Sequence, residues 1–79
     1  MNILQNPEYT PAKLLDWMHG VLHLKNDAAL SRALKVAPPV ISKIRRKALP
    51  VGDSMLVKMH DLTGLPIENL RKQMGIGAP

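Results

Sequence analysis

Residues 27–47 read DAALSRALKVAPPVISKIRRK and predict two short amphipathic helices joined by a tight corner. The first helix is expected from Asp27 to Leu34, the corner is Lys35-Val36-Ala37, and the second helix runs from Pro38 to about Arg46. Apolar residues share one side of both helices at the spacing of a helical face; these are Leu30, Leu34, Val36, Ile41 and Ile44. Such a pair cannot bury its own apolar side, so flanking helices must complete a core.

Three more helices are predicted outside this pair. They are expected at about Pro11 to Leu24, Asp53 or Ser54 to Thr63, and Ile67 to Met74. Thr10 and Asn26 are suitable N-caps, as are Asp53 or Ser54, and Gly64 is a typical helix stop. The residues expected to face inward at helical spacing are Leu14, Leu15, Met18, Val21, Leu22, Met55, Leu56, Met59, Leu62, Ile67, Leu70 and Met74. The fold class is therefore all-α: one compact domain of five short helices.

The 79 residues allow one domain with one small core. Residues 1–10 are expected to form an N-terminal arm, residues 11–74 the folded domain, and residues 75–79 a flexible tail. The absence of cysteine excludes disulfides and thiolate metal sites. No apolar run approaches the roughly 20 residues of a membrane span, and residues 1–11 lack the features of a signal peptide. We therefore expect a cytoplasmic protein.

Positive charge is concentrated in the helix pair. The chain carries a net charge of +5, but residues 25–47 alone carry +6 and all other residues together −1. The cations of this segment are Lys25, Arg32, Lys35, Lys43, Arg45, Arg46 and Lys47. A basic surface of this kind attracts polyanions by releasing their counterions. A solvated face is the simpler interpretation of an isolated charge run, but concentration on one helix pair favours nucleic acid.

The second helix of the pair presents a cationic outer face with Ser42, Lys43, Arg45 and Arg46. A short cationic helix held outward on a rigid corner fits the major groove of DNA. The main expected partner is therefore double-stranded DNA, and the protein is expected to be nucleoid-associated when bound.

The chain resembles the lambda-repressor-like, Cro/C1-type (XRE) helix-turn-helix domains over roughly Leu24 to Leu70. The matching stretches are ALSRALKVAPPVISKIRRK, where that family has its two motif helices, and LTGLPIENL, where it has a helix end, a glycine and a final short helix. Two differences stand out. Lys35 occupies the corner position where the family usually has glycine, and Pro38-Pro39 stand where it often has polar residues.

This resemblance implies a five-helix lambda-repressor-like fold and a sequence-specific transcriptional regulator. Such a regulator would act as a small dimer on a palindromic operator, with half-sites about 34 Å apart and helix 38–46 in the major groove. Candidate dimer surfaces are the last helix with Met74 and Ile76, or the arm with Ile3, Leu4 and Tyr9.

Groove geometry assigns expected roles to individual side chains. Ser42 and Lys43 are expected at base edges, Arg46 is a further base contact, and Pro39 is limited to apolar contact, as with a thymine methyl. The expected phosphate contacts are Arg32, Lys35, Arg45 and Lys47. The resemblance adds Asn26, because the start of the first motif helix often contacts a phosphate in that family.

Other functions remain open. The main alternative is a protein-interaction module, antitoxin-like or a phage-encoded inhibitor, that uses the same helices; a nonspecific nucleic-acid binder is a third. Asp16, His19 and His23 share one helical stripe and could hold a divalent metal, but a solvated polar face is the simpler interpretation. We expect no metal, cofactor or membrane partner. No catalytic motif or glycine-rich phosphate loop is present in the sequence, so we expect no enzyme activity.

Overall fold

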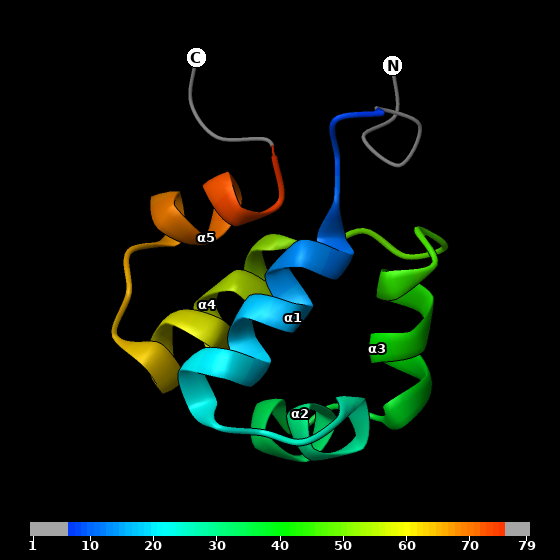
Figure 1. The fold of residues 1–79 in the computed structure, drawn as a ribbon, viewed down its shortest axis with the longest axis vertical. Coiled ribbons are helices and arrows are strands. Elements are labelled where there is room, and N and C mark those ends of the chain that lie inside the picture. The colour runs from blue at the N-terminus through cyan, green and yellow to red at the C-terminus, as the bar shows by residue number, and fades with distance from the viewer. Residues whose placement is uncertain (1–6, 76–79) are drawn as a thin grey trace.

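The computed structural model describes residues 7–75, and these residues form five helices and no strand (Figure 1). The helices are α1 (Pro11–Leu22), α2 (Asp27–Leu34), α3 (Pro38–Arg45), α4 (Asp53–Thr63) and α5 (Ile67–Gln73). In Figure 1, α1 lies at the centre, α3 stands at the right, α5 lies at the upper left and α2 crosses the bottom. The prediction of an all-α fold is confirmed.

One core holds the helices together. Its buried side chains are Tyr9, Leu14, Leu15, Met18, Leu30, Leu34, Ile41, Ile44, Met55, Leu56, Met59, Leu70 and Met74. Within residues 7–75, Tyr9 is the one aromatic side chain among these, so the core is aliphatic as predicted. Val36, Leu22 and Ile67 are half-buried against it. Each fully buried Leu or Ile contributes roughly 1.5–3 kcal/mol to folding through removal of apolar surface from water.

Two residues predicted to be buried are exposed. Val21 and Leu62 retain 37% and 41% of their accessible surface. Both lie in the last turn of their helix. Helix α1 also ends two residues earlier than expected, because His23 adopts a left-handed conformation and the Leu24 N–H donates back to the His19 carbonyl (2.8 Å).

The segment before α1 is attached to the core. The Tyr9 hydroxyl accepts a hydrogen bond from the Val51 N–H (3.2 Å), and the ring is fully buried. The Thr10 N–H and hydroxyl both donate to the Met74 carbonyl oxygen (2.8 and 3.2 Å). Thr10 therefore gives α1 no side-chain cap, contrary to prediction, because its hydroxyl is used at the end of α5. Tyr9 and Thr10 are therefore part of the folded domain and not of the expected N-terminal arm.

The candidate dimer surfaces change accordingly. Tyr9 and Met74 are buried inside one chain, so neither side chain is available to a second copy. Ile3, Leu4 and Ile76 lie outside the described residues. The dimer therefore stays a prediction without an assigned surface.

The remaining caps follow the sequence in part. The Asn26 Oδ1 accepts a hydrogen bond from the Ala29 N–H (2.9 Å) and caps α2 as predicted. Gly64 ends α4 in the left-handed conformation (φ 71°), also as predicted. The prediction that Asp53 or Ser54 caps α4 is wrong, since Gly52 occupies that position and no side chain caps the helix.

Gly75 provides a test of how the two ends of the fold meet. It has φ +82°, and a Cβ atom there would collide with the backbone carbonyl oxygen of Glu8. We expect Gly75→Ala to lower the free energy of unfolding by about 1 kcal/mol, because a left-handed alanine is strained and the collision must be relieved by movement. Urea unfolding of both proteins measures this loss; equal midpoints would mean that residue 75 does not pack against residue 8.

Candidate nucleic-acid interface

The corner between α2 and α3 is tight and closed by backbone hydrogen bonds. Lys35 is left-handed (φ 59°, ψ 43°), its N–H donates to the Arg32 carbonyl (3.2 Å), and the Val36 N–H donates to the Ser31 carbonyl (3.0 Å). These two bonds form the closing pattern that glycine usually permits at a helix end. Ser31 is fully buried and donates its hydroxyl proton to the Ala28 carbonyl (2.7 Å), so it leaves no unpaired polar atom in the core.

Helix α3 has one buried and one exposed side. Successive residues of a helix are rotated by about 100°, which places Ile41 and Ile44 together, and both are fully buried. The opposite side, about 140° wide on the same spacing, holds five exposed residues that we call the outer stripe: Pro38, Pro39, Ser42, Lys43 and Arg46. The four side chains predicted to contact bases, Pro39, Ser42, Lys43 and Arg46, all lie on this stripe.

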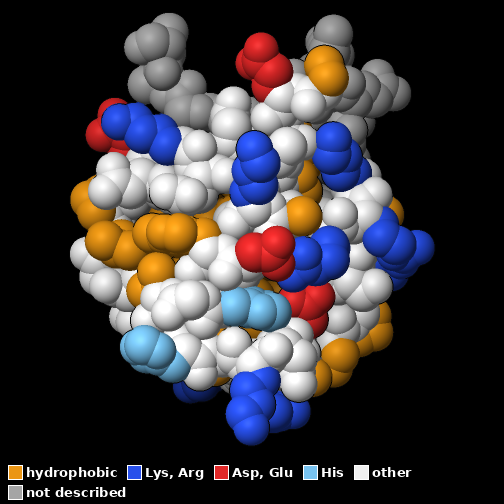
Figure 2. All heavy atoms as spheres, viewed as in Figure 1, with side chains coloured by type: hydrophobic (Ala, Val, Ile, Leu, Met, Phe, Trp, Pro, Cys, Tyr) orange, Lys and Arg blue, Asp and Glu red, His pale blue; other side chains and the backbone are white. Residues whose placement is uncertain are grey.

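The outer stripe changes character along the helix. Its first turn is apolar, and its later turns carry Ser42, Lys43 and Arg46. Cations near a helix C-terminus are stabilised by the helix dipole. In Figure 2, α3 lies at the right edge, where hydrophobic atoms gather at its lower, N-terminal end and Lys or Arg side chains gather above them.

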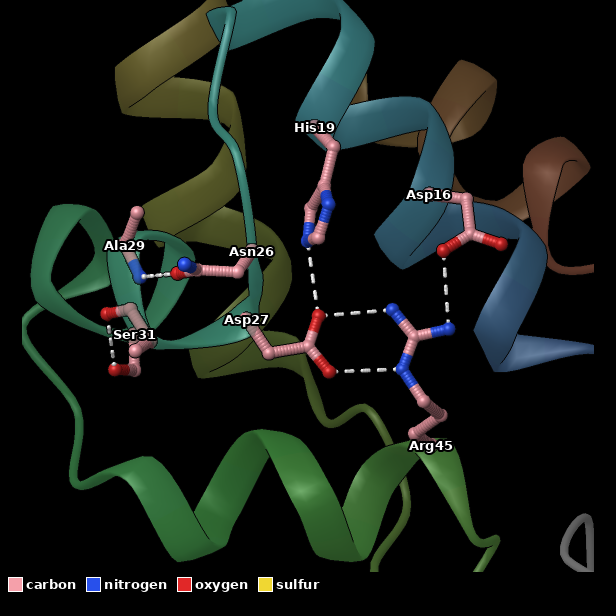
Figure 3. Close-up of polar contacts among 8 residues, drawn as sticks. Asp16, His19, Asn26, Asp27, Ala29, Ser31 and Arg45 are labelled. Carbon is pink, nitrogen blue, oxygen red and sulfur yellow. Dashed lines mark hydrogen bonds and ion pairs between the residues drawn. The ribbon is translucent and has the colours of Figure 1, made fainter.

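Arg45 belongs to the other side of α3. Its Nε and Nη2 donate to the two carboxylate oxygens of Asp27 (both 2.9 Å), and its Nη1 lies 3.0 Å from Asp16 Oδ1. His19 Nε2 lies 2.9 Å from Asp27 Oδ1 and is the donor, because an ionised carboxylate only accepts. Figure 3 shows how this cluster, which we call the Arg45 clamp, joins α1, α2 and α3.

The pairing favours the charged forms of Asp27 and Arg45. The pKa of the Asp27 carboxyl is lowered, chiefly by the hydrogen bonds from Arg45, against a smaller opposing effect of burial. The pKa of Arg45 is raised, chiefly by its hydrogen bonds to Asp27. Asp27 is therefore an ionised carboxylate paired with Arg45, and not an unpaired negative charge that would repel a phosphate.

The predicted phosphate contacts fall into two groups. Arg45 is engaged by two carboxylates, with 30% of its side chain exposed, so its guanidinium has few donors left for a phosphate. Arg32 and Lys35 are exposed and Lys47 is half-buried, and no ion pair among residues 7–75 involves any of these three. Asn26 is exposed, and its Oδ1 is used in the cap, which leaves its amide nitrogen as the donor for a ligand.

The sequence did not reveal the clamp. Asp16, His19 and Asp27 are 29, 26 and 18 residues from Arg45, too far for any local pattern to pair them.

The structure also bears on the divalent-metal site that the sequence left open for Asp16, His19 and His23. Asp16 and His19 are engaged in the clamp, His23 lies beyond the end of α1, and no group of three potential metal ligands comes together within residues 7–75.

Two lysines hold strained conformations beside α3. Lys35 precedes α3 and Lys47 follows it, both with left-handed backbones (φ 59° and 62°). His23 is left-handed too (φ 56°) and ends α1. A non-glycine residue in this conformation costs about 1 kcal/mol or somewhat more, so lysine at position 35 is less stable than glycine would be.

We therefore expect Lys35→Gly to raise the free energy of unfolding by about 0.5–1 kcal/mol, because glycine adopts the left-handed conformation without strain. If Lys35 contacts a phosphate of DNA, the same change should also weaken DNA binding several-fold. His23→Gly is the matched control: it relieves the same strain but should leave DNA affinity unchanged. Thermal unfolding and band shifts measure both quantities, and equal DNA affinities for the two variants would contradict a phosphate contact at Lys35.

Within residues 7–75, no helix combines the length and the apolar character needed to cross a lipid bilayer. Comparison of the chain with protein-family models, with curated proteins and with solved structures found no match.

Proposed function

We propose that this protein is a sequence-specific DNA-binding regulator that places α3 in the major groove, and that α2, the corner and α3 act as a lambda-repressor-like helix-turn-helix. The observation that carries the proposal is the outer stripe: every exposed side chain of α3 with hydrogen-bonding groups or charge points away from the core on one side. A single helix side with a hydroxyl and two cations matches the donor and acceptor pattern of the groove.

In this proposal, some side chains contact bases and others contact phosphates. Lys43 and Arg46 suit the acceptors O6 and N7 of guanine, and the Ser42 hydroxyl can donate or accept. Arg32, Lys35, Lys47 and the Asn26 amide would contact phosphates on either side, which fixes the position of α3 without reading sequence. Because one small domain buries little surface, a two-fold dimer on a palindrome would provide affinity and specificity.

Arg45 has a different role in this proposal from the one its charge predicts. It would hold α3 at a defined angle to α1 and α2, so that the outer stripe is preorganised for the groove. A preorganised helix loses less conformational entropy when it binds, which strengthens affinity.

Selection of bound duplexes from a random pool tests the proposal. We expect an enriched, palindromic sequence with half-sites about 34 Å, one helical turn, apart. Affinity for it should fall steeply as salt concentration rises, since phosphate contacts release counterions. Recovery of an unenriched pool would leave only nonspecific binding, and the absence of any salt-sensitive DNA binding would reject nucleic acid as the partner.

One feature favours a protein partner as the second candidate. An open cavity of about 240 Å³ lies between α2 and α4, lined by Ala33, Leu34, Lys35, Lys58, Asp61 and Leu62. Its partly apolar lining and the exposed Leu62 suit a protein contact of the kind expected for an interaction module. This candidate predicts that Leu62→Ser abolishes binding of the protein partner, and that changes on the outer stripe do not.

A further inference from the structure

The first turn of α3 is an exposed apolar surface beside cations. Ala37, Pro38 and Pro39 are all exposed, and we call these three residues the α3 tip. The hydrophobic atoms at the lower right edge of Figure 2 lie over this end of α3. Lys35 lies two residues before the tip and Lys43 one helical turn after Pro39, both exposed.

The start of α3 is also poor in free backbone donors. Pro38 and Pro39 have no N–H, and the Val40 N–H already donates to the Ala37 carbonyl (2.9 Å). Most helix starts present free N–H groups that bind phosphates or polar ligands. The start of α3 has lost most of that capacity, and the exposed side chains of its tip can bind only by apolar contact.

The major groove offers one apolar group along its base edges, the C5-methyl of thymine; 5-methylcytosine carries the same group. We propose that the α3 tip is a specificity determinant that selects duplexes with 5-methylpyrimidines opposite Pro38 and Pro39. This inference rests on the proposed insertion of α3 into the major groove. The flanking cations favour a polyanion over an apolar protein surface as the occupant.

The test uses the duplex enriched by selection and full-length protein. Each thymine in turn is replaced by deoxyuridine, which removes one methyl and changes nothing else on the base edge. We expect about fourfold weaker binding at one or two thymines per half-site, the fold-change that corresponds to one buried methyl group, and no change elsewhere. In a second arm, the sensitive T·A pair becomes C·G with either cytosine or 5-methylcytosine, and the methylated duplex should bind about fourfold more tightly.

Protein variants link the effect to the tip. Pro39→Ser keeps a residue suited to the first helical turn but removes the apolar ring, and it should make binding insensitive to deoxyuridine at the affected position. Pro66→Ser is the matched control, because Pro66 is an exposed proline preceding α5, on the opposite side of the molecule from α3 (Figure 1). It should retain full sensitivity. Circular dichroism confirms that both variants fold.

The outcomes separate the two proposals. An enriched duplex that binds equally with thymine and deoxyuridine at every position overturns the methyl inference and leaves sequence-specific binding intact. Methyl sensitivity that persists at every thymine in the double variant Pro38→Ser, Pro39→Ser also overturns it, since a residue outside these two prolines then contacts the methyl. Failure to enrich any duplex overturns both proposals together.

Discussion

Lys43→Glu should weaken binding to the selected duplex by more than a hundredfold. Lys43 is fully on the outer stripe, is exposed, and has no ion pair within residues 7–75. The change removes the proposed base contact, worth about 1–3 kcal/mol, and places a carboxylate against the polyanion, for a total of about 3 kcal/mol or more. Because the side chain contacts solvent rather than the core, the free energy of unfolding should change by less than about 0.5 kcal/mol.

A matched charge reversal separates a local contact from net charge. Lys72→Glu changes the charge by the same amount on α5, on the opposite side of the molecule from α3 (Figure 1). Screening beyond about 8–10 Å should limit its effect on affinity to a few-fold at physiological salt. Titrations of both variants by fluorescence anisotropy give the comparison. Similar losses from the two changes would show that DNA senses only the overall charge, which would refute the assigned position of α3.

Arg45→Met should lower the free energy of unfolding by about 2 kcal/mol at neutral pH. Methionine keeps much of the aliphatic stem but removes the bidentate pair with Asp27 and the contact with Asp16. A hydrogen bond to a charged group contributes about 1.5–3 kcal/mol, and we expect a loss close to that of one such bond, because Arg45 and Asp27 are each about one-third exposed to solvent. For a domain of this size, the melting temperature should fall by roughly 8–15 °C.

The pH dependence of this loss identifies its origin. The Asp27 pKa is lowered in the folded protein, so the carboxylate contributes stability that is fully present above its unfolded value, near 3.9, and is lost as pH falls through the folded value. The coupling energy between Asp27→Asn and Arg45→Met, from a double-mutant cycle, should therefore be large at pH 6 and much smaller at pH 2–3. A coupling energy that does not change with pH would show that packing, not the ion pair, makes Arg45 stabilising.

The same variant distinguishes the two roles considered for Arg45. If Arg45 contacts a phosphate, Arg45→Met lowers the slope of log affinity against log salt by about 1. If it orients α3 through the clamp, the slope is unchanged and only affinity falls. Arg32→Met, which removes an exposed cation of α2 with no ion pair in the described part of the chain, provides the reference for a lost phosphate contact.

Much of this protein follows from its sequence. The five helices come from local preferences: apolar residues at helical spacing, prolines in first turns, and stops such as Gly64. The outer stripe follows as well, because burial of Ile41 and Ile44 necessarily turns Ser42, Lys43 and Arg46 outward on a helix with 3.6 residues per turn. These features depend on residues within one or two helical turns of each other, so the pattern of residue types along the sequence is enough to predict them.

Only the tertiary structure decided which residues far apart in the sequence contact one another. Arg45 has the same charge as Arg46, yet one binds two carboxylates and the other faces solvent, because α1 and α2 bring Asp16 and Asp27 to one side of α3 alone. Tyr9, expected in the N-terminal arm, is buried because the two ends of the folded domain meet over the core. Such partners are set by helix packing across tens of residues, and periodicity along the chain contains no information about which helices will pack together.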